Sequence, residues 1–190
     1  MKGFFNMDSP LFVFLSRLAD LMILNLLFIV CCIPIVTIGA ACTGLSYVTL
    51  KMAEKVDGYI VRGFFHSFKQ NFRQATLIWL IMLAILVILV IDFMLTGQMG
   101  GSMTSVMRVM VFVGGALWLM VFLYVFPILA RFENTIAGTF RNSALISFAN
   151  APRTILMIAV IALSVAASWW NGQTIAWSIL IWFMMGFSLL

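Results

Sequence analysis

Four long stretches of the chain contain no charged side chain, and they constrain its fold more than any other feature. The stretches are 21–50, 74–91, 109–130 and 154–190, which hold 30, 18, 22 and 37 residues. A helix of about 20 apolar residues crosses the hydrocarbon core of a bilayer. Only 9% of the residues are charged and 64% are hydrophobic, whereas soluble domains average about 25% charged residues. These values exclude a water-soluble domain and a disordered chain, and they predict an all-α integral membrane protein.

We expect a single transmembrane domain over residues 1–190, a helical bundle in which six spans are favoured and five are the alternative. The favoured spans are 11–33, 35–51, 75–95, 108–130, 154–170 and 174–190. Trp169, Trp170 and Gly172 divide the last uncharged run, because tryptophan is enriched at the membrane–water interface and glycine marks turns. The segment 35–51 decides between the two counts, since it is either a short span or a cytoplasmic connector.

The sequence that follows the first span contains helix breakers and small residues. Pro34 and Gly39 are expected to end the first helix, whereas Ala40 and Gly44 are small enough for close helix packing in a membrane. A broken helix frees backbone polar groups, which membranes tolerate only where protein or water satisfies them. We therefore regard Pro34, Thr37 and Gly39 as candidates for lining a cavity, with a simple turn as the alternative.

Two amphipathic helices are expected to lie in the membrane interface, over residues 59–73 and 132–150. In the first, one helical face is basic (Arg62, His66, Lys69 and Arg73) and the other is apolar (Val61, Phe64, Phe65, Phe68 and Phe72). In the second, an apolar residue recurs every fourth position (Phe132, Ile136, Phe140, Ala144 and Phe148). Such patterns are typical of helices whose apolar face meets lipid or protein while the basic face meets head groups.

The distribution of basic residues predicts the orientation of the chain. Of the eleven Lys and Arg residues, five lie in 51–73 and three in 131–153. Because cytoplasmic loops carry the excess of basic residues, we expect both loops to be cytoplasmic, and the net charge of +5 does not indicate a nucleic-acid partner. If 35–51 crosses the membrane, both chain ends lie inside; if it does not, the N-terminus lies outside. The loop 96–105 is extracellular in both arrangements.

A short pattern recurs at a fixed offset of 80 residues: Ser67-Phe68 and Arg73 correspond to Ser147-Phe148 and Arg153. Each set precedes a predicted span. The chain therefore contains either a repeated unit of span, interfacial helix and span or a coincidence of three matches. Internal repeats of this kind are common in transporters.

Polar residues close to membrane depth are candidates for binding or partner contact, because such residues are rare there and often functional. Arg17 and Asp20 are spaced to pair on one helix face, as a partner contact or as an interfacial anchor. Asn25 is expected to form an interhelical hydrogen bond. The candidates near the two cytoplasmic loops are Lys69, Arg73, Arg131, Glu133 and Asn134. For the last three, structural capping of the loop is the alternative.

No combination of residues predicts catalysis, a cofactor or a metal site. Cys31, Cys32 and Cys42 lie in an uncharged run without histidine, so we expect small buried hydrophobic residues rather than a disulfide framework or a zinc site. His66 is the only histidine and has no second metal ligand at helical spacing. We therefore expect a protein that is not an enzyme.

Several motifs spread along the chain resemble one family of bacterial membrane proteins. They are Gly3-Phe4-Phe5-Asn6, Ser16-Arg17-Leu18-Ala19-Asp20, Pro34-Ile35-Val36-Thr37-Ile38-Gly39, Phe68-Lys69-Gln70-Asn71-Phe72-Arg73 and Phe126-Pro127-Ile128-Leu129-Ala130-Arg131-Phe132-Glu133-Asn134. Together they look like the YesL family, a domain-of-unknown-function family that is common in Gram-positive bacteria. The resemblance covers nearly the whole chain.

This resemblance implies a multi-pass protein of the bacterial plasma membrane. Members of the family are often encoded beside carbohydrate ABC transporters, extracellular sugar-binding proteins and sugar-responsive regulators. The implied role is a non-catalytic accessory or regulatory component of carbohydrate uptake, with the bilayer, transporter or sensor proteins and a second copy of the chain as expected partners. A small-solute transporter or channel subunit is the alternative function. Similar proteins usually continue past the last span into a short basic tail, whereas this sequence ends at Leu190 within an apolar stretch.

Overall fold

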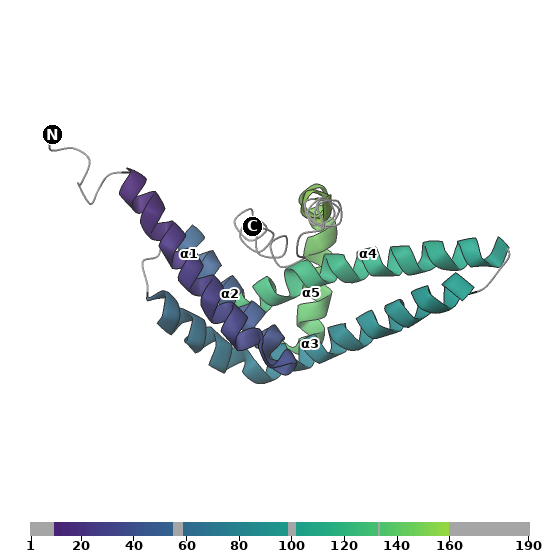
Figure 1. Ribbon diagram of the computed structural model, residues 1–190, viewed down its shortest axis with the longest axis horizontal. Helices are drawn as coiled ribbons and strands as arrows, with labels where there is room; N and C mark the ends of the chain where they lie inside the picture. The colour runs from purple at the N-terminus through teal and green to yellow at the C-terminus, as the bar shows by residue number, and fades with distance from the viewer. Residues whose placement is uncertain (1–9, 55–58, 99–101, 133, 160–190) are drawn as a thin grey trace.

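The computed structural model describes residues 10–54, 59–98, 102–132 and 134–159 of the chain (Figure 1). Within these ranges it is built of helices and contains no strand. The helices are α1 (Pro10–Cys32), the 3-10 helix η1 (Ile35–Thr37), α2 (Ile38–Ala53), α3 (Ile60–Gln98), α4 (Ser102–Arg131) and α5 (Ile136–Ala149). Residues 151–159 are also helical. The all-α prediction is confirmed for this part of the chain.

Four helical segments are long and apolar enough to cross a bilayer. They are Leu15–Cys32, Ile35–Ala53, Ile60–Gly97 and Thr104–Arg131, and Ile35–Ala53 is the least apolar of them. These segments correspond to the first four predicted spans, so the structure is compatible with a membrane location. The predicted span 174–190 and most of 154–170 lie outside the described residues. The count of six spans therefore stays a prediction.

The boundary between the first amphipathic stretch and the following span is absent from the structure. The sequence predicts an interfacial helix over 59–73 and a separate span over 75–95, but both belong to α3, a single helix of 39 residues. No glycine or proline stands between positions 64 and 96, so nothing in this stretch terminates the helix. At 1.5 Å per residue α3 is about 58 Å long, roughly twice the hydrocarbon thickness of a bilayer. Figure 1 shows that α3 changes direction between its first third and the remainder.

Helix α2 lies antiparallel beside the first half of α3, and two glycines set the distance between them. A Cβ atom at Gly39 would lie 2.6 Å from the Cβ of Trp79 and would also overlap the carbonyl oxygen of Ala75. A Cβ atom at Gly44 would lie 3.1 Å from the Phe64 ring. The two backbones therefore approach as closely as glycine allows, in the manner of small-residue contacts between membrane helices.

This geometry corrects one prediction and confirms another. Gly39 lies inside the first turn of α2, so the prediction that it helps to break the helix is wrong; its role is close packing. Ala40 is fully buried and Gly44 is in contact with α3, as the small-residue pattern predicts. Helix α1 packs against the α2–α3 pair through Leu24, which contacts Leu45 and other residues of these two helices, and the three helices form a bundle.

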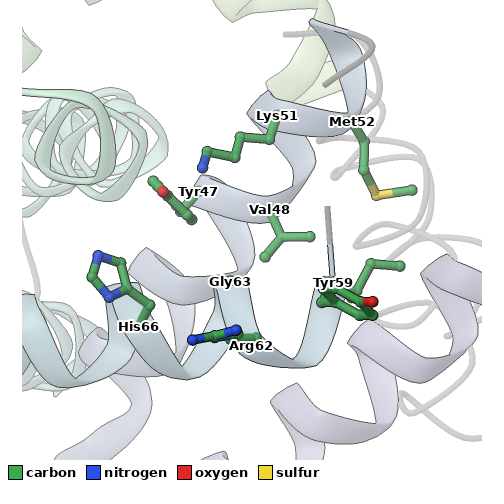
Figure 2. A pocket seen from close by; sticks show the side chains of 9 residues that line it. Tyr47, Val48, Lys51, Met52, Tyr59, Arg62, Gly63 and His66 are labelled. Carbon is green, nitrogen blue, oxygen red and sulfur yellow. The ribbon is translucent and has the colours of Figure 1, made fainter. Parts of the chain in front are cut away.

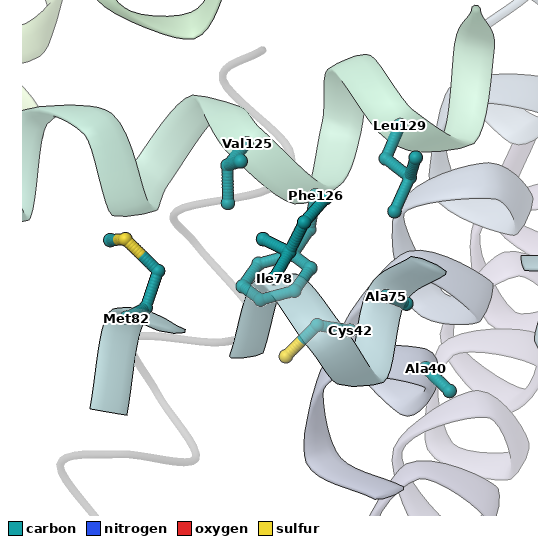
Figure 3. Packing of buried hydrophobic residues seen from close by; sticks show 8 residues of the cluster. All are labelled: Ala40, Cys42, Ala75, Ile78, Met82, Val125, Phe126 and Leu129. Carbon is teal, nitrogen blue, oxygen red and sulfur yellow. The ribbon is translucent and has the colours of Figure 1, made fainter. Parts of the chain in front are cut away.

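A second hydrophobic core joins α2, the middle of α3 and the end of α4 (Figure 3). Its buried members are Ala40, Cys42, Ala75, Ile78, Met82, Val125, Phe126 and Leu129. Trp118 and Phe122 of α4 stack beside it with ring centroids 5.0 Å apart, and the Trp118 indole donates a hydrogen bond to the Met82 carbonyl at 2.9 Å. Cys42 is buried as predicted, while Cys31 and Cys32 are half-buried. Beyond this core, the far halves of α3 and α4 run on as a hairpin (Figure 1).

The apolar stripe predicted for 132–150 is only partly covered by other helices. Ile136 and Phe140 pack against the second hydrophobic core, whereas Phe132 and Phe148 are 51% and 62% exposed. The most buried residues of α5 are Thr139, Ser143 and Ser147, to which this pattern gives no role. The first two hydroxyl groups bond to carbonyl groups of their own helix, which removes most of the penalty of burying them. Their small volume lets α5 pack closely on α4.

The repeat suggested by the sequence is reproduced only in part. Ser67 and Ser147 are both 1% exposed. However, α3 continues through Ser67, whereas α5 ends at Ala149 and a new helical segment starts after Asn150. The matching burial supports a repeated unit and the different backbone opposes it, so the repeat stays a hypothesis.

Candidate functional site

Three carbonyl groups at the break between α1 and α2 accept side-chain hydrogen bonds. The Thr37 hydroxyl donates to the carbonyl oxygens of Cys31 and Pro34, at 2.6 and 2.7 Å. The Trp79 indole donates to the Ile35 carbonyl at 2.9 Å. These side chains supply the hydrogen bonds that a break near a membrane requires. The simple turn therefore accounts for the segment from Pro34 to Thr37 without a cavity.

The candidate residues on α1 do not form the contacts that their spacing predicts. Among the described residues no ion pair joins Arg17 to Asp20, and the side chain of Asn25 forms no interhelical hydrogen bond. Arg17 is exposed, so solvent or head groups can satisfy its charge. The neighbouring Leu24 is fully buried against the bundle, and the helical rotation between adjacent residues turns Asn25 away from that direction.

Two of the candidates at and after the end of α4, Arg131 and Asn134, contact residues of other helices. Arg131 forms an ion pair with Glu54 at the end of α2, with 3.3 Å between nitrogen and oxygen. The Gln74 side-chain amide donates to the backbone carbonyl of Asn134 at 2.5 Å. Glu133 lies outside the described residues. Because the Arg131 and Glu54 side chains are 57% and 53% exposed, their pair contributes at most about 1 kcal/mol.

The amphipathic first third of α3 has the predicted basic face, and its aromatic face is divided. Lys69 and Arg73 are exposed. Phe64 is fully buried against α1 and α2, whereas Phe65 and Phe72 are 38% and 36% exposed. The aromatic residues of this part of α3 therefore serve two surfaces: Phe64 packs against α1 and α2, and Phe65 and Phe72 face outward.

A pocket of about 350 Å³ lies between the last turns of α2 and the first turns of α3 (Figure 2). Its lining consists of Tyr47, Val48, Lys51, Met52, Tyr59, Ile60, Arg62, Gly63 and His66. On α2 the polar members are spaced four residues apart, and on α3 Arg62 and His66 have the same spacing, so each pair lies on one helix face. The antiparallel packing of α2 and α3 places the two faces opposite each other.

The polar groups of this pocket are basic and aromatic. The Lys51 ammonium lies 4.5 Å from the centroid of the Tyr47 ring, within the range of a cation–π contact. The His66 ring lies 6.5 Å from the Tyr47 ring. Figure 2 shows these three side chains and Arg62 on one side of the pocket, with Tyr59 and Met52 on the other. Such an arrangement can receive an anionic group and stack a planar or ring-shaped one.

The sequence alone does not identify this pocket. It marks Arg62 and His66 as part of an interfacial face and Lys51 as one of the loop charges, and it gives Tyr47 and Tyr59 no role. The sequence does show that Tyr47 and Lys51, and likewise Arg62 and His66, are spaced to share a helix face. This spacing indicates a pocket only once α2 and α3 are known to be antiparallel neighbours.

A second depression, of about 510 Å³, lies between the far halves of α3 and α4. Its lining includes Leu89, Phe93, Phe112 and Gly115 and contains no charged side chain. It offers acyl chains or another apolar helix a surface but offers a polar solute no hydrogen-bonding groups. Within the described ranges, no group of three or more His, Cys, Asp or Glu residues could hold a metal ion.

Comparison with known proteins gives one match. A family model described as "Protein of unknown function, DUF624" matches residues 21–93, which is consistent with the resemblance to the YesL family. The matched range contains about half of α1, all of α2 and most of α3, and therefore all the pocket residues. No curated protein and no solved structure matches the chain.

Proposed function

We propose that this chain is a multi-pass membrane protein that acts as a non-catalytic accessory or regulatory component of a carbohydrate uptake system in the bacterial plasma membrane. The link to carbohydrate uptake comes from the resemblance to the YesL family. The observation that carries the docking role is the exposed basic face of α3, where Lys69 and Arg73 form no ion pair with any described residue.

In this proposal the second half of α3 and the facing part of α4, within its candidate span Thr104–Arg131, cross the membrane as a hairpin. Residues 77–95 contain a single charge, Asp92, and most of their apolar side chains are exposed; they suit contact with lipid. The first half of α3 carries the basic residues and packs with α2. The positive-inside tendency then places 51–73 and 131–153 in the cytoplasm.

The basic face is suited to a protein partner because it stands on a rigid helix beside outward-facing aromatic rings. Arginine and aromatic residues are enriched in protein interfaces, where the ring supplies contact area and the cation selects an acidic partner. Arg73 lies next to Phe72, which is 36% exposed. The expected partner is a cytoplasmic or membrane-embedded subunit of a sugar transporter or sensor with an acidic surface.

Photo-crosslinking in cells tests this proposal. A crosslinking amino acid at Lys69 or Arg73 is expected to capture a transporter or sensor subunit during growth on a carbohydrate. The same amino acid at Met110, which is 69% exposed on the apolar hairpin, serves as the control for unspecific capture. Identical products from the basic face and from Met110, or no protein product from the basic face, would count against the docking role.

The alternative function, a small-solute transporter or channel subunit, depends on the break after α1 and on the repeat. The break is satisfied by Thr37 and Trp79, so the accessory role is preferred. Sugar flux into proteoliposomes that contain only this protein would overturn that preference.

A further inference from the structure

We propose that the pocket between α2 and α3 binds a phosphate ester, the chemical group shared by anionic lipid head groups and soluble sugar phosphates. This inference is independent of the carbohydrate link and of any protein partner. It rests on the charge of the pocket, on its helix geometry and on its surroundings.

The charge of the described lining is uncompensated. Lys51, Arg62 and His66 supply cationic or hydrogen-bonding nitrogen groups, and no carboxylate belongs to the described lining. The nearest acidic residue in the described sequence, Glu54, is engaged by Arg131 at 3.3 Å. Lys51 and Arg62 form no ion pair with described residues. Lysine and arginine are the usual partners of phosphate oxygens, because their hydrogen bonds to phosphate are charge-assisted.

The helix geometry reinforces this charge. Tyr59 and Ile60, at the start of α3, line the pocket. The first backbone N–H groups of a helix lack intrahelical partners, and the helix dipole gives this end a partial positive charge. The start of α3 therefore adds partial positive charge at the Tyr59 side of the pocket, opposite the basic side chains (Figure 2).

The walls of the pocket and its neighbours favour an ester over a free ion. Val48, Met52 and Ile60 provide apolar contact, and Tyr47 and Tyr59 offer aromatic faces to a glycerol or sugar moiety. Close to the pocket, Val61 and Phe65 are 46% and 38% exposed on α3. An apolar surface beside a cationic pocket suits a group at a membrane surface, where acyl chains and a head-group phosphate occur together.

The test compares two charge-matched double variants of the full chain in nanodiscs. Lys51→Gln/Arg62→Gln removes two cations from the pocket, and Lys69→Gln/Arg73→Gln removes two cations from α3 outside the pocket. Binding of trace labelled phosphatidylglycerol in phosphatidylcholine discs is measured, as is binding of glycerol 3-phosphate to the same discs. A cation close to an anionic lipid contributes about fivefold to its binding, so the loss of two cations that contact the phosphate should cost about 25-fold. The control variant removes two cations that lie outside the pocket, and we expect it to lose severalfold less.

Pocket-dependent binding of phosphatidylglycerol that glycerol 3-phosphate does not displace supports the proposal and identifies a lipid as the source. Pocket-dependent binding of glycerol 3-phosphate also supports it and identifies a soluble ester. Equal losses in the two variants, or no binding of either probe, would overturn the proposal, because general surface charge would then explain all the attraction. Lys51→Arg retains the cation and is expected to retain binding, which separates loss of charge from loss of folding.

Discussion

At the scale of single residues, stability depends on a few positions where backbone meets backbone or where a carbonyl group lacks its helical partner. Gly39 sets the distance between α2 and α3, and Thr37 satisfies the turn between α1 and α2. Neither role requires conformational freedom of the residue itself. Both arise from what lies opposite the residue in the folded molecule.

Gly39→Ala is expected to destabilise the protein by about 1–3 kcal/mol, because the new methyl group would overlap the Ala75 carbonyl and lie 2.6 Å from the Cβ of Trp79. Gly115→Ala is the matched control, since no atom lies within 4 Å of its added Cβ. It should be neutral or up to about 1 kcal/mol more stable, because alanine favours helices. Thermal unfolding in detergent measures both. Equal stability of the two variants would contradict the close packing.

Thr37→Val is expected to lower the free energy of unfolding by about 1–2 kcal/mol, since the Cys31 and Pro34 carbonyl groups would lose the hydroxyl donor that lies 2.6 and 2.7 Å away. Thr37→Ser keeps the hydroxyl and should stay near the original stability. The same unfolding experiment distinguishes the two. If valine and serine behaved alike, the hydroxyl would not be what satisfies the turn.

At the scale of elements, α3 and α5 show how composition and packing diverge. The basic-to-apolar change near residue 74 predicts two elements, yet α3 continues because neither glycine nor proline interrupts it. In α5 the pattern of large apolar residues does not indicate that Thr139, Ser143 and Ser147 are the most buried residues of the helix. Small side chains allow close contact between helices, and the Thr139 and Ser143 hydroxyl groups bond to carbonyl groups one turn earlier.

The buried face of α5 can be tested with two small-to-large substitutions. Ser143→Leu adds volume at a position that is fully buried, and should destabilise the packing of α5 on α4 by about 1–3 kcal/mol. Ala137→Leu adds a similar volume at an exposed position of the same helix and should change stability by less than about 0.5 kcal/mol. Thermal unfolding of the two variants is compared in one detergent. A larger effect at Ala137 would show that the hydroxyl residues do not form the closely packed face of α5.

At the scale of the whole molecule, the position at which the turn between α1 and α2 meets α3 bears on how the chain would cross a membrane. The turn between α1 and α2 meets α3 at Trp79, near the middle of that helix. From Trp79 to Gly97, α3 extends a further 18 residues or about 27 Å. The turn and the far end of α3 therefore differ in depth by nearly the thickness of a hydrocarbon core, provided that the far half of α3 spans it.

Cysteine labelling from outside the cell tests this difference in depth. In a background without the native cysteines, Gly97→Cys should react with a membrane-impermeant maleimide, because the 96–105 loop is predicted to be extracellular. Val36→Cys, in the turn and 50% exposed, should not react from outside. Rapid external labelling at Val36 would place the turn at the outer surface and support the arrangement in which 35–51 is a full span.

The sequence by itself indicated an all-α protein with helices apolar enough to span a membrane, and the positions of most of these helices. Uncharged runs of about the length that crosses a bilayer favour helices, because a helix satisfies its backbone groups internally in lipid. They predict α1, α2, α4 and the apolar half of α3, although α4 begins at Ser102, six residues before the predicted span. The exposed basic face of α3 also follows from helical spacing alone.

Only the tertiary structure decided which faces meet. It joined Arg131 to Glu54, gave Gly39 a packing role and placed Lys51 opposite Arg62 and His66. Helical periodicity specifies what shares a face within one helix, but it carries no information about which helix packs on that face or in which direction. Which helices pack together depends on how closely their backbones can approach at small residues such as Gly39 and Gly44, where an added methyl group would push α2 and α3 apart.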